Sequence, residues 1–246
     1  MSISVHDELI EQNQEYWNKK PLLQIIYGNL YRLVASQLSN LDNPKIVELG
    51  SGIGNIKMVI PDCLRTDLFP HPWLDQVENA YKLSFANETV SDLILTDVFH
   101  HLKYPGTALK EFHRVLRKGG RVIMLEPCIS ALGLIVYGLL HVEPIAITKP
   151  IQWFAPEDWS PENIDYYAAQ GNASRIFTGR KFLSQLSDWQ SIKTIRLSAI
   201  SYAASGGYSK PQLYPTSALP LIQKVEKLLD PLPALFATRM VVILQK

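Results

Sequence analysis

Hydrophobic residues recur along this chain with two alternating spacings. Between residues 21 and 38 they return every three or four positions, which is typical of one face of a helix, and Pro21 suits a helix start. Short apolar runs bounded by turn residues predict strands at 46–49, 64–67, 73–78, 91–97, 121–126, 195–200 and 236–246. Helical spacing is predicted at 8–17, 21–38, 56–59, 105–116, 182–189 and 218–229. This alternation indicates a parallel sheet covered by helices on both faces.

The chain has 246 residues, enough for one large α/β domain or two small ones. We interpret it as one domain, 1–246, with four parts. They are an N-terminal helical cap (1–44), a nucleotide-binding core (45–127), an inserted substrate lid (128–176) and the C-terminal part of the sheet (177–246).

The composition and net charge of the chain indicate which kinds of partner it can bind. The chain is 47% hydrophobic and 19% charged, which is typical of a globular protein. Its formal net charge is only +1, so it has no strong positive field that would attract nucleic acid. The isolated Cys63 and Cys128 form no C-x-x-C pair, and the N-terminal residues do not resemble a signal peptide, so we expect a cytoplasmic protein.

The apolar stretch 129–140 is shorter than the ~20 residues that span a bilayer. It favours a buried helix, with a substrate lid or a patch resting on a membrane as alternatives. The oligomeric state stays open.

A glycine-rich loop follows the first predicted strand. Glu48 precedes Gly50, Gly52 and Gly54, and strand, glycine turn and helix together are typical of a nucleotide or cofactor loop. The spacing G-x-G-x-G differs from the dinucleotide pattern, and the missing Lys-Ser or Lys-Thr excludes a P-loop. An ordinary tight turn is the alternative. Asp67 follows Glu48 by 19 residues, the place of an acid that binds ribose hydroxyls, although it also suits a turn.

Further motifs occur in a fixed order after this loop. They are Asn79-Ala80-x-x-Leu83-x-Phe85, Asp92-Leu93-Ile94, Asp97-Val98-Phe99-His100-His101-Leu102 and Glu111-x-x-Arg114-Val115-Leu116-Arg117-Lys118-Gly119-Gly120-Arg121. With the glycine loop, this ordered set resembles the type 11 domain of the class I S-adenosylmethionine (SAM) dependent methyltransferases, over residues 45–127. The resemblance implies a Rossmann-like fold with a seven-stranded, mostly parallel sheet whose last strand is antiparallel.

The resemblance also implies a cofactor site. It assigns SAM contacts to Glu48, Gly50, Ser51, Gly52, Gly54, Asn55, Asp67, Leu68, Asn79, Ala80, Asp97 and Val98. In the family, the acid at the place of Glu48 holds the ammonium end, and the residue at the place of Asn79 is commonly Asp and accepts from adenine. An amide oxygen can still accept that bond, but without charge assistance.

Two adjacent histidines are the candidate general bases. His100 and His101 follow the fourth strand, and only histidine titrates unperturbed near neutral pH. The alternative is that one of the pair packs into the loop. No H-E-x-x-H or C-x-x-C set is present, so we expect no protein-held metal.

Candidate acceptor-binding residues lie outside the core motifs. They are Tyr31, Arg32, His101, Trp153 and Tyr166, with ordinary packing as the alternative for the aromatic residues. The tail, with Ser205-Gly206-Gly207-Tyr208 and Phe236-Ala237-x-Arg239-Met240, also resembles bacterial methyltransferases of surface-polysaccharide biosynthesis.

The sequence therefore predicts a methyltransferase that acts on a small molecule. A sugar hydroxyl in a nucleotide- or lipid-linked glycan precursor is the favoured acceptor. One alternative is a methyltransferase whose acceptor is a quinone, phenol or lipid, and another is a SAM-binding protein without catalytic activity. The glycine spacing disfavours a nicotinamide oxidoreductase.

Overall fold

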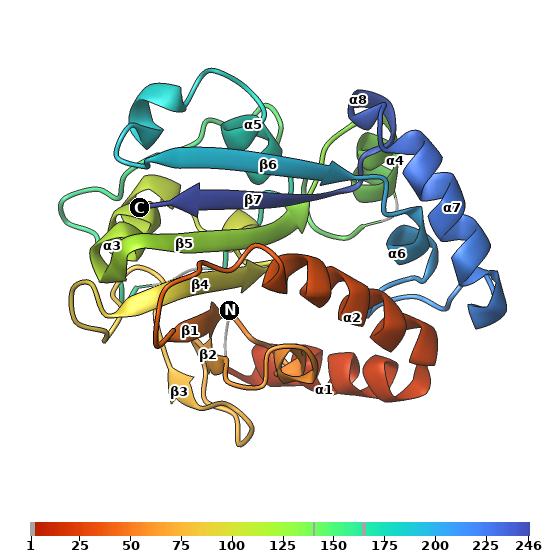
Figure 1. Cartoon of the computed structure of the whole chain (residues 1–246), viewed down its shortest axis with the longest axis horizontal. Helices are drawn as coiled ribbons and strands as arrows, with labels where there is room; N and C mark the ends of the chain where they lie inside the picture. Colours follow the sequence, from red (N-terminus) through yellow and green to blue (C-terminus); the bar gives the residue numbers. More distant parts are fainter. Residues whose placement is uncertain (1–2, 140, 164–165) are drawn as a thin grey trace.

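Seven strands form a single sheet in the order β3-β2-β1-β4-β5-β7-β6 (Figure 1). The computed structural model describes residues 3–139, 141–163 and 166–246. The strands are β1 (Ile46–Leu49), β2 (Leu64–Asp67), β3 (Gln76–Val77), β4 (Val90–Thr96), β5 (Leu116–Pro127), β6 (Ser191–Leu197) and β7 (Arg239–Gln245). Every pair from β3 to β5 is parallel, whereas β7 lies antiparallel between β5 and β6. The predicted sheet, including its antiparallel last strand, is confirmed.

Successive residues of the central strands enter two different cores. Leu93 and Leu95 of β4 belong to one hydrophobic cluster, and Ile94 between them belongs to the other. Because side chains alternate across a strand, a strand that is apolar throughout must be buried on both faces. This explains why β4, β5 and β7 show continuous apolar runs.

Helices cover both faces of the sheet. The helices are α1 (Ile3–Lys19), α2 (Pro21–Ala35), α3 (Pro105–Val115), α4 (Ala131–Leu139), α5 (Asn172–Phe177), α6 (Ile200–Ala204), α7 (Leu219–Leu229) and α8 (Pro233–Phe236), with short 3₁₀ turns η1 (Asn55–Met58), η2 (Phe99–His101), η3 (Leu183–Leu186) and η4 (Thr216–Ala218). The apolar side of α2 packs on one face, and α3 and α5 pack on the other. Within the described part of the chain, no helix is both long enough and apolar enough to cross a bilayer.

Several element boundaries differ from the sequence prediction, and the last strand, predicted at 236–246, is Arg239–Gln245. The third strand is only Gln76–Val77, and at the residue before it the Asp75 side chain accepts the Arg65 N–H at 2.9 Å. The sixth strand, predicted at 195–200, is Ser191–Leu197, because its register is set by pairing with β7, and α6 begins at Ile200.

Two further differences concern helices. The helix predicted at 182–189 is only the 3₁₀ turn Leu183–Leu186. Helix α3 ends at Val115 and β5 starts directly at Leu116, so the glycine pair Gly119-Gly120 lies inside the strand, beside a register shift. Leu140, the last residue of the predicted apolar stretch 129–140, lies outside the described residues.

Candidate active site

The glycine loop follows β1 in the chain and packs against the turn after β4. Gly50, Gly52 and Gly54 have φ values of 71°, 51° and 73°. A Cβ on Gly50 would lie 2.4 Å from Cγ2 of Val98, so the backbone here approaches the β4 turn too closely for any side chain. The loop therefore sits at the carboxyl edge of the sheet, where ligands of open α/β sheets bind.

Glu48 lies beneath this loop with one carboxylate oxygen unpaired. The residue is 2% exposed, and its Oε2 has no hydrogen-bond partner in the described part of the chain. Burial raises the pKa of Glu48 to about 8. A buried carboxylate oxygen without a partner is costly, and a cationic ligand such as an ammonium group would satisfy it.

Asp67 holds the glycine loop in shape. Its Oδ2 accepts the Gly52 N–H at 2.9 Å, and its Oδ1 accepts the Leu68 N–H at 2.7 Å. Ser51 fixes the other side of the loop, because its Oγ accepts the Thr66 N–H at 3.1 Å. Each carboxylate oxygen can accept a second bond, so the predicted ribose contact of Asp67 is compatible with this role.

A tryptophan that the motif analysis missed also supports the loop. Trp73 donates its indole N–H to the Gly52 carbonyl at 2.8 Å, and it stacks on His71 at a centroid distance of 4.8 Å. Farther along, the Asn55 amide donates to the Tyr208 hydroxyl at 3.3 Å. This bond connects the loop to the Ser205-Gly206-Gly207-Tyr208 segment of the tail.

The amide of Asn79 is already engaged. Its Oδ1 accepts the Tyr81 N–H at 2.9 Å, and its Nδ2 donates to the Pro161 carbonyl at 2.8 Å. The next residue, Ala80, packs against the hydrophobic core. The predicted adenine contact of Asn79 would therefore use the second lone pair of Oδ1.

Asp97 is fixed by a buried arginine from the opposite end of the chain. Arg239 at the start of β7 is 1% exposed, and its Nη2 lies 2.9 Å from Oδ2 of Asp97. Asp97 has a φ of 58°, a conformation that this bidentate pair helps to hold. The guanidinium also lies 4.9 Å from the ring centroid of Tyr202. In the sequence, Arg239 belongs to the tail motif, and it is a charge that opens an otherwise apolar strand.

Glu126, at the end of β5, organises the turn that carries the histidines. Its Oε1 accepts the backbone N–H groups of Val98 and Phe99 at 3.0 and 2.7 Å. Its Oε2 lies 2.7 Å from Nδ1 of His100, and both side chains are buried. No sequence motif marks Glu126 for this role, because the partners of its carboxylate lie on the turn after β4.

A second carboxylate, from the insertion, faces both histidines. Oε2 of Glu143 lies 3.4 Å from Nε2 of His100, and Oε1 lies 3.7 Å from Nε2 of His101. Glu143 also accepts hydrogen bonds from the Tyr166 hydroxyl at 2.7 Å and from the Gln170 amide. Tyr166, predicted to contact the acceptor, therefore does lie beside the histidines.

The two histidines have opposite electrostatic characters. Burial disfavours a charge on His100, but the Glu126 and Glu143 carboxylates outweigh it and raise the pKa of His100 to about 10. Burial and the neighbouring His100 charge lower the pKa of His101. The Nδ1 of His101 lies 2.9 Å from the Tyr167 carbonyl, which can only accept, so the ring proton sits there and Nε2 carries the lone pair.

The same three side chains have the spacing of a metal site. The donor atoms of His100, His101 and Glu143 lie within 4.8 Å of one another. Two imidazoles and a carboxylate are common ligands of zinc. Without a metal, the Glu126 and Glu143 carboxylates raise the pKa of His100, so the cluster forms a charged hydrogen-bond network, and a metal would have to displace the proton on Nε2 of His100.

The remaining predicted acceptor residues are separated by the fold. Tyr31 is buried in the core beneath α2, and burial raises its pKa well above the ordinary range, with the Glu48 charge as a further cause. Arg32 is exposed on the same helix and donates to Asn29 at 2.9 Å. Trp153 packs on α3, where its carbonyl accepts the Gly106 N–H at 2.8 Å, and it stacks on Phe182. These contacts explain Arg32 and Trp153 as surface and packing residues.

The insertion lies across the site at both ends. Near Asn79 it contributes the Pro161 carbonyl, and near the histidines the Ala169 N–H donates to the His100 carbonyl at 3.0 Å. Arg175 of α5 donates to the Ala146 and Lys149 carbonyls at 2.9 and 2.8 Å and so braces the segment before it. Residues 128–176 thus contact the chain both at Asn79 and at His100.

Comparisons with known proteins agree with this architecture. A family model described as a methyltransferase domain matches residues 63–124. No curated protein sequence matches the chain significantly. Among solved structures, a SAM-dependent methyltransferase from Thermotoga maritima aligns over 97% of this chain and 99% of its own, with 13% identity and a TM-score of 0.53. A SAM-dependent methyltransferase from Archaeoglobus fulgidus aligns over 91% and 94%, with 11% identity and a TM-score of 0.53.

A partial match concerns a chain in a complex between the Haloferax volcanii Trm112 methyltransferase activator and a methyltransferase. It covers 38% of this chain and half of that one, with 16% identity and a TM-score of 0.32. Residues 63–124 thus match a methyltransferase domain, and the chain has the Rossmann-like fold of the two SAM-dependent methyltransferase structures that align over nearly its whole length.

Proposed function

We propose that the protein transfers a methyl group from SAM to a small-molecule acceptor. The observation that carries this proposal is the unpaired, buried Oε2 of Glu48 beneath the glycine loop. SAM supplies an activated methyl group on a positively charged sulfur, and it also carries an ammonium group that matches this oxygen. The position at the carboxyl edge of the sheet, next to the histidine turn, supports the same assignment.

The cofactor site would follow the edge from β1 to β4. Glu48 binds the ammonium end, and the loop Gly50 to Gly54, with Ser51 and Asn55 fixing its shape, gives the ligand close access to the backbone. Asp67 and Leu68 bind the ribose, and Asn79 and Ala80 bind the adenine. Asp97 and Val98 would border the reacting end of the cofactor, and the bidentate contact to Arg239 keeps Asp97 in place.

His101 is the general base in this proposal, and His100 is a positioning residue. SAM would supply the methyl group to the acceptor oxygen and leave as S-adenosylhomocysteine, and Nε2 of His101 would take the acceptor proton. His101 suits this role because its lowered pKa keeps it neutral and its Nδ1–H is fixed by the Tyr167 carbonyl. His100, whose charge is balanced by Glu126 and Glu143, holds the turn and helps to keep His101 unprotonated.

The acceptor class we favour is a sugar hydroxyl of a nucleotide- or lipid-linked glycan precursor, methylated on the cytoplasmic side. The resemblance of the tail to surface-polysaccharide methyltransferases supports this class. So does the half-exposed rim of Tyr166, Glu143 and His101, which combines an aromatic ring with hydrogen-bonding groups. We propose that residues 128–176 act as the lid over this acceptor.

One observation favours a second candidate. The exposed apolar side chains Leu134, Ile135 and Leu139 of α4 would suit a quinone, phenol or lipid acceptor. A non-catalytic SAM-binding protein is a third candidate, favoured by the engaged amide of Asn79.

Calorimetric titration tests the cofactor, with SAM, S-adenosylhomocysteine and NAD as ligands. Saturable binding of the first two that is weakened by Glu48→Gln but not by the exposed Glu15→Gln supports the proposal. NAD binding without SAM binding would overturn it. S-adenosylhomocysteine release, measured with glycan precursors and with phenols and quinones, then separates the acceptor classes. SAM binding without turnover on either panel would favour the non-catalytic protein.

A further inference from the structure

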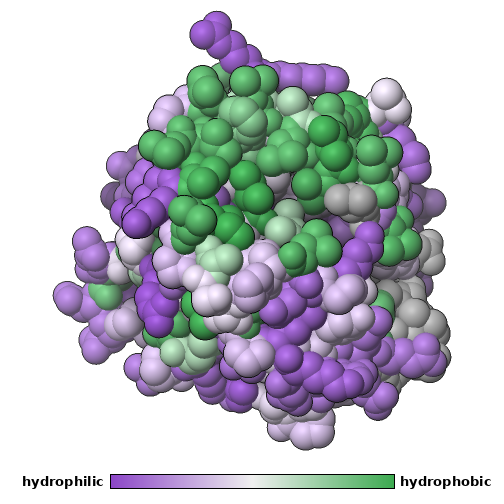
Figure 2. Space-filling view, turned by 90° about the vertical axis from the view of Figure 1, so that its right-hand side faces the viewer, coloured by the Kyte–Doolittle hydropathy of each residue, from purple (hydrophilic) through white to green (hydrophobic). Residues whose placement is uncertain are grey.

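An apolar surface lies at the same end of the molecule as the carboxyl edge of the sheet. Figure 1 shows α4, α7 and α8 gathered at the end to which β4, β5 and β6 point, and Figure 2 shows apolar side chains concentrated on that face. The exposed apolar residues of these segments, here called the α4–α7–α8 face, are Leu134, Ile135, Leu139, Val142, Leu221, Val225, Leu228, Leu232 and Leu235. Val142 is 92% exposed, Leu139 78% and Leu228 77%, values that ordinary packing does not explain.

Helix α7 turns an apolar stripe toward solvent. Leu221, Val225 and Leu228 follow the spacing of one helical face, and all three are exposed. Leu219 is the buried residue of this helix, on its opposite side. A surface helix of a globular protein normally faces its apolar side inward, so this orientation implies an apolar partner outside the described chain.

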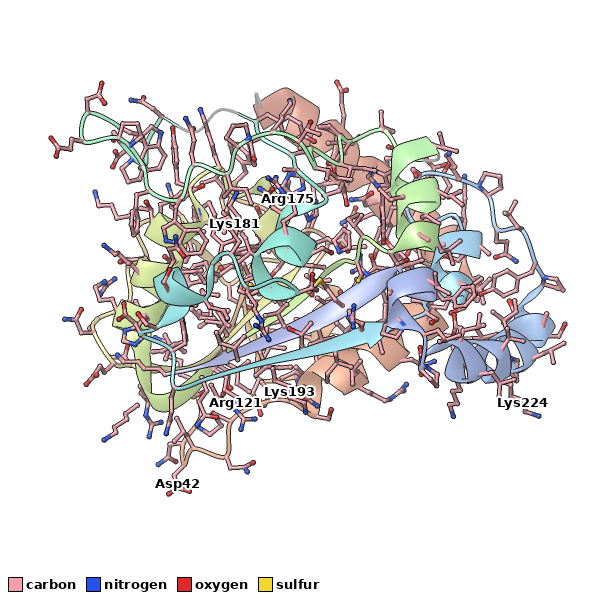
Figure 3. The ribbon with its side chains drawn as sticks, turned by 90° about the horizontal axis from the view of Figure 1, so that it is seen from above. Asp42, Arg121, Arg175, Lys181, Lys193 and Lys224 are labelled. Carbon is pink, nitrogen blue, oxygen red and sulfur yellow. The ribbon has the colours of Figure 1, made fainter. Side chains whose placement is uncertain are left out.

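The acidic and basic side chains of α7 and its C-cap face opposite ways, the acids toward the protein and the lysines toward solvent. Oε1 of Glu226 accepts the Ser201 N–H at 2.6 Å, and Oδ1 of Asp230 accepts the Ser198 N–H at 2.9 Å, so both carboxylates turn toward the protein. Lys224 and Lys227 are exposed and form no ion pair with a described residue. At 100° per residue, both lysines fall along one edge of the apolar stripe. Figure 3 shows Lys224 at the outer side of α7.

We propose that the α4–α7–α8 face docks on an anionic lipid bilayer. An outward apolar stripe with lysines at its edge is the pattern of helices that lie in the membrane interface, where lysines reach the phosphate groups. A second copy of the chain is the less favourable occupant. Two such faces would bring Lys224 and Lys227 against their own counterparts, with the carboxylates turned away.

Docking there would place the acceptor site beside the membrane. Val142 of this face directly precedes Glu143, which contacts both histidines. An acceptor attached to a lipid could therefore enter from the bilayer, whereas a nucleotide-linked acceptor would gain nothing from the contact. This step rests on the proposed function, but the docking itself does not.

The test is co-sedimentation with vesicles of phosphatidylglycerol and phosphatidylcholine, compared with phosphatidylcholine alone. We expect binding to the anionic vesicles that falls with added salt. Leu228→Glu and the double change Lys224→Glu with Lys227→Glu should each weaken it at least roughly tenfold. The matched controls are the exposed Leu183→Glu and the double change Lys181→Glu with Lys193→Glu, whose lysines lie away from α7 (Figure 3). The controls should bind like the wild type.

Two results would overturn the docking proposal. One is the absence of binding to anionic vesicles by a protein that binds SAM normally in solution. The other is a dimer in sedimentation equilibrium that Leu228→Glu dissociates, which would assign the face to a second copy. Vesicle binding by a protein that does not bind SAM would instead leave the docking intact and remove the proposed function.

Discussion

The Glu126 carboxylate meets the His100 imidazole at 2.7 Å in a place where neither side chain reaches solvent. Glu126 ends the apolar core of β5, and His100 lies on the turn after β4. The same carboxylate also accepts two backbone N–H groups of that turn. One acid therefore fixes both the conformation of the histidine turn and the charge of His100.

Glu126→Gln should destabilise the protein. The amide keeps the shape of the side chain but removes the negative charge that balances His100, and breaking a buried pair from one side costs about 3–5 kcal/mol. Chemical denaturation at pH 7 measures this change. Glu88→Gln, at an exposed acid that pairs with Lys246, is the matched control and should cost at most about 1 kcal/mol. Equal effects of the two changes would contradict the organising role of Glu126.

His101→Gln should remove the general base and leave cofactor binding intact. We expect kcat to fall by about 10²–10⁴-fold, while the Kd for SAM changes little. In the wild type, kcat should rise with pH through the lowered pKa of His101 and stay level above it, because only the neutral ring accepts a proton. The variant should lose this rise. A wild-type profile without an ionisation below pH 6.5 would contradict the assignment.

Glu48→Gln should weaken SAM binding without destabilising the free protein. A hydrogen bond to a charged group contributes about 1.5–3 kcal/mol, so the Kd should increase roughly 10- to 100-fold. Burial raises the pKa of Glu48 to about 8, so near pH 7 the free protein holds a proton there that an ammonium ligand displaces. Calorimetry in buffers of different ionisation enthalpy should detect this proton release in the wild type. Release that persists in Glu48→Gln would assign the proton to another group.

Gly50→Ala should disrupt the cofactor loop. The new Cβ would lie 2.4 Å from Val98, at a positive φ that alanine rarely adopts. We expect a loss of about 1–3 kcal/mol in stability, because the turn must shift or remain strained. Thermal unfolding measures the loss, and Gly179→Ala, whose Cβ would meet nothing closer than 3.8 Å, is the control. A Gly50→Ala protein as stable as its control would show that the loop is not held against Val98.

The sequence by itself determined the fold and the glycine loop at the carboxyl edge of the sheet, because both depend on local signals. Apolar periodicity places strands and helices, and Gly50, Gly52 and Gly54 mark a loop that only glycine forms easily. The ordered motifs also identified His100 and His101. Strand ends were less well determined, because β6 takes its register from β7 and not from its own residues.

Only the tertiary structure decided the electrostatics of the site. Glu126, Glu143 and Arg239 reach their partners from a neighbouring strand, from the insertion and from the start of the last strand. Their spacing in the sequence carries no signal, because a side-chain contact depends on packing between elements. The same packing makes His100 a cation and lowers the pKa of His101, a distinction that two adjacent identical residues cannot show in the sequence. It also left the apolar stripe of α7 facing outward, where periodicity alone predicts a buried face.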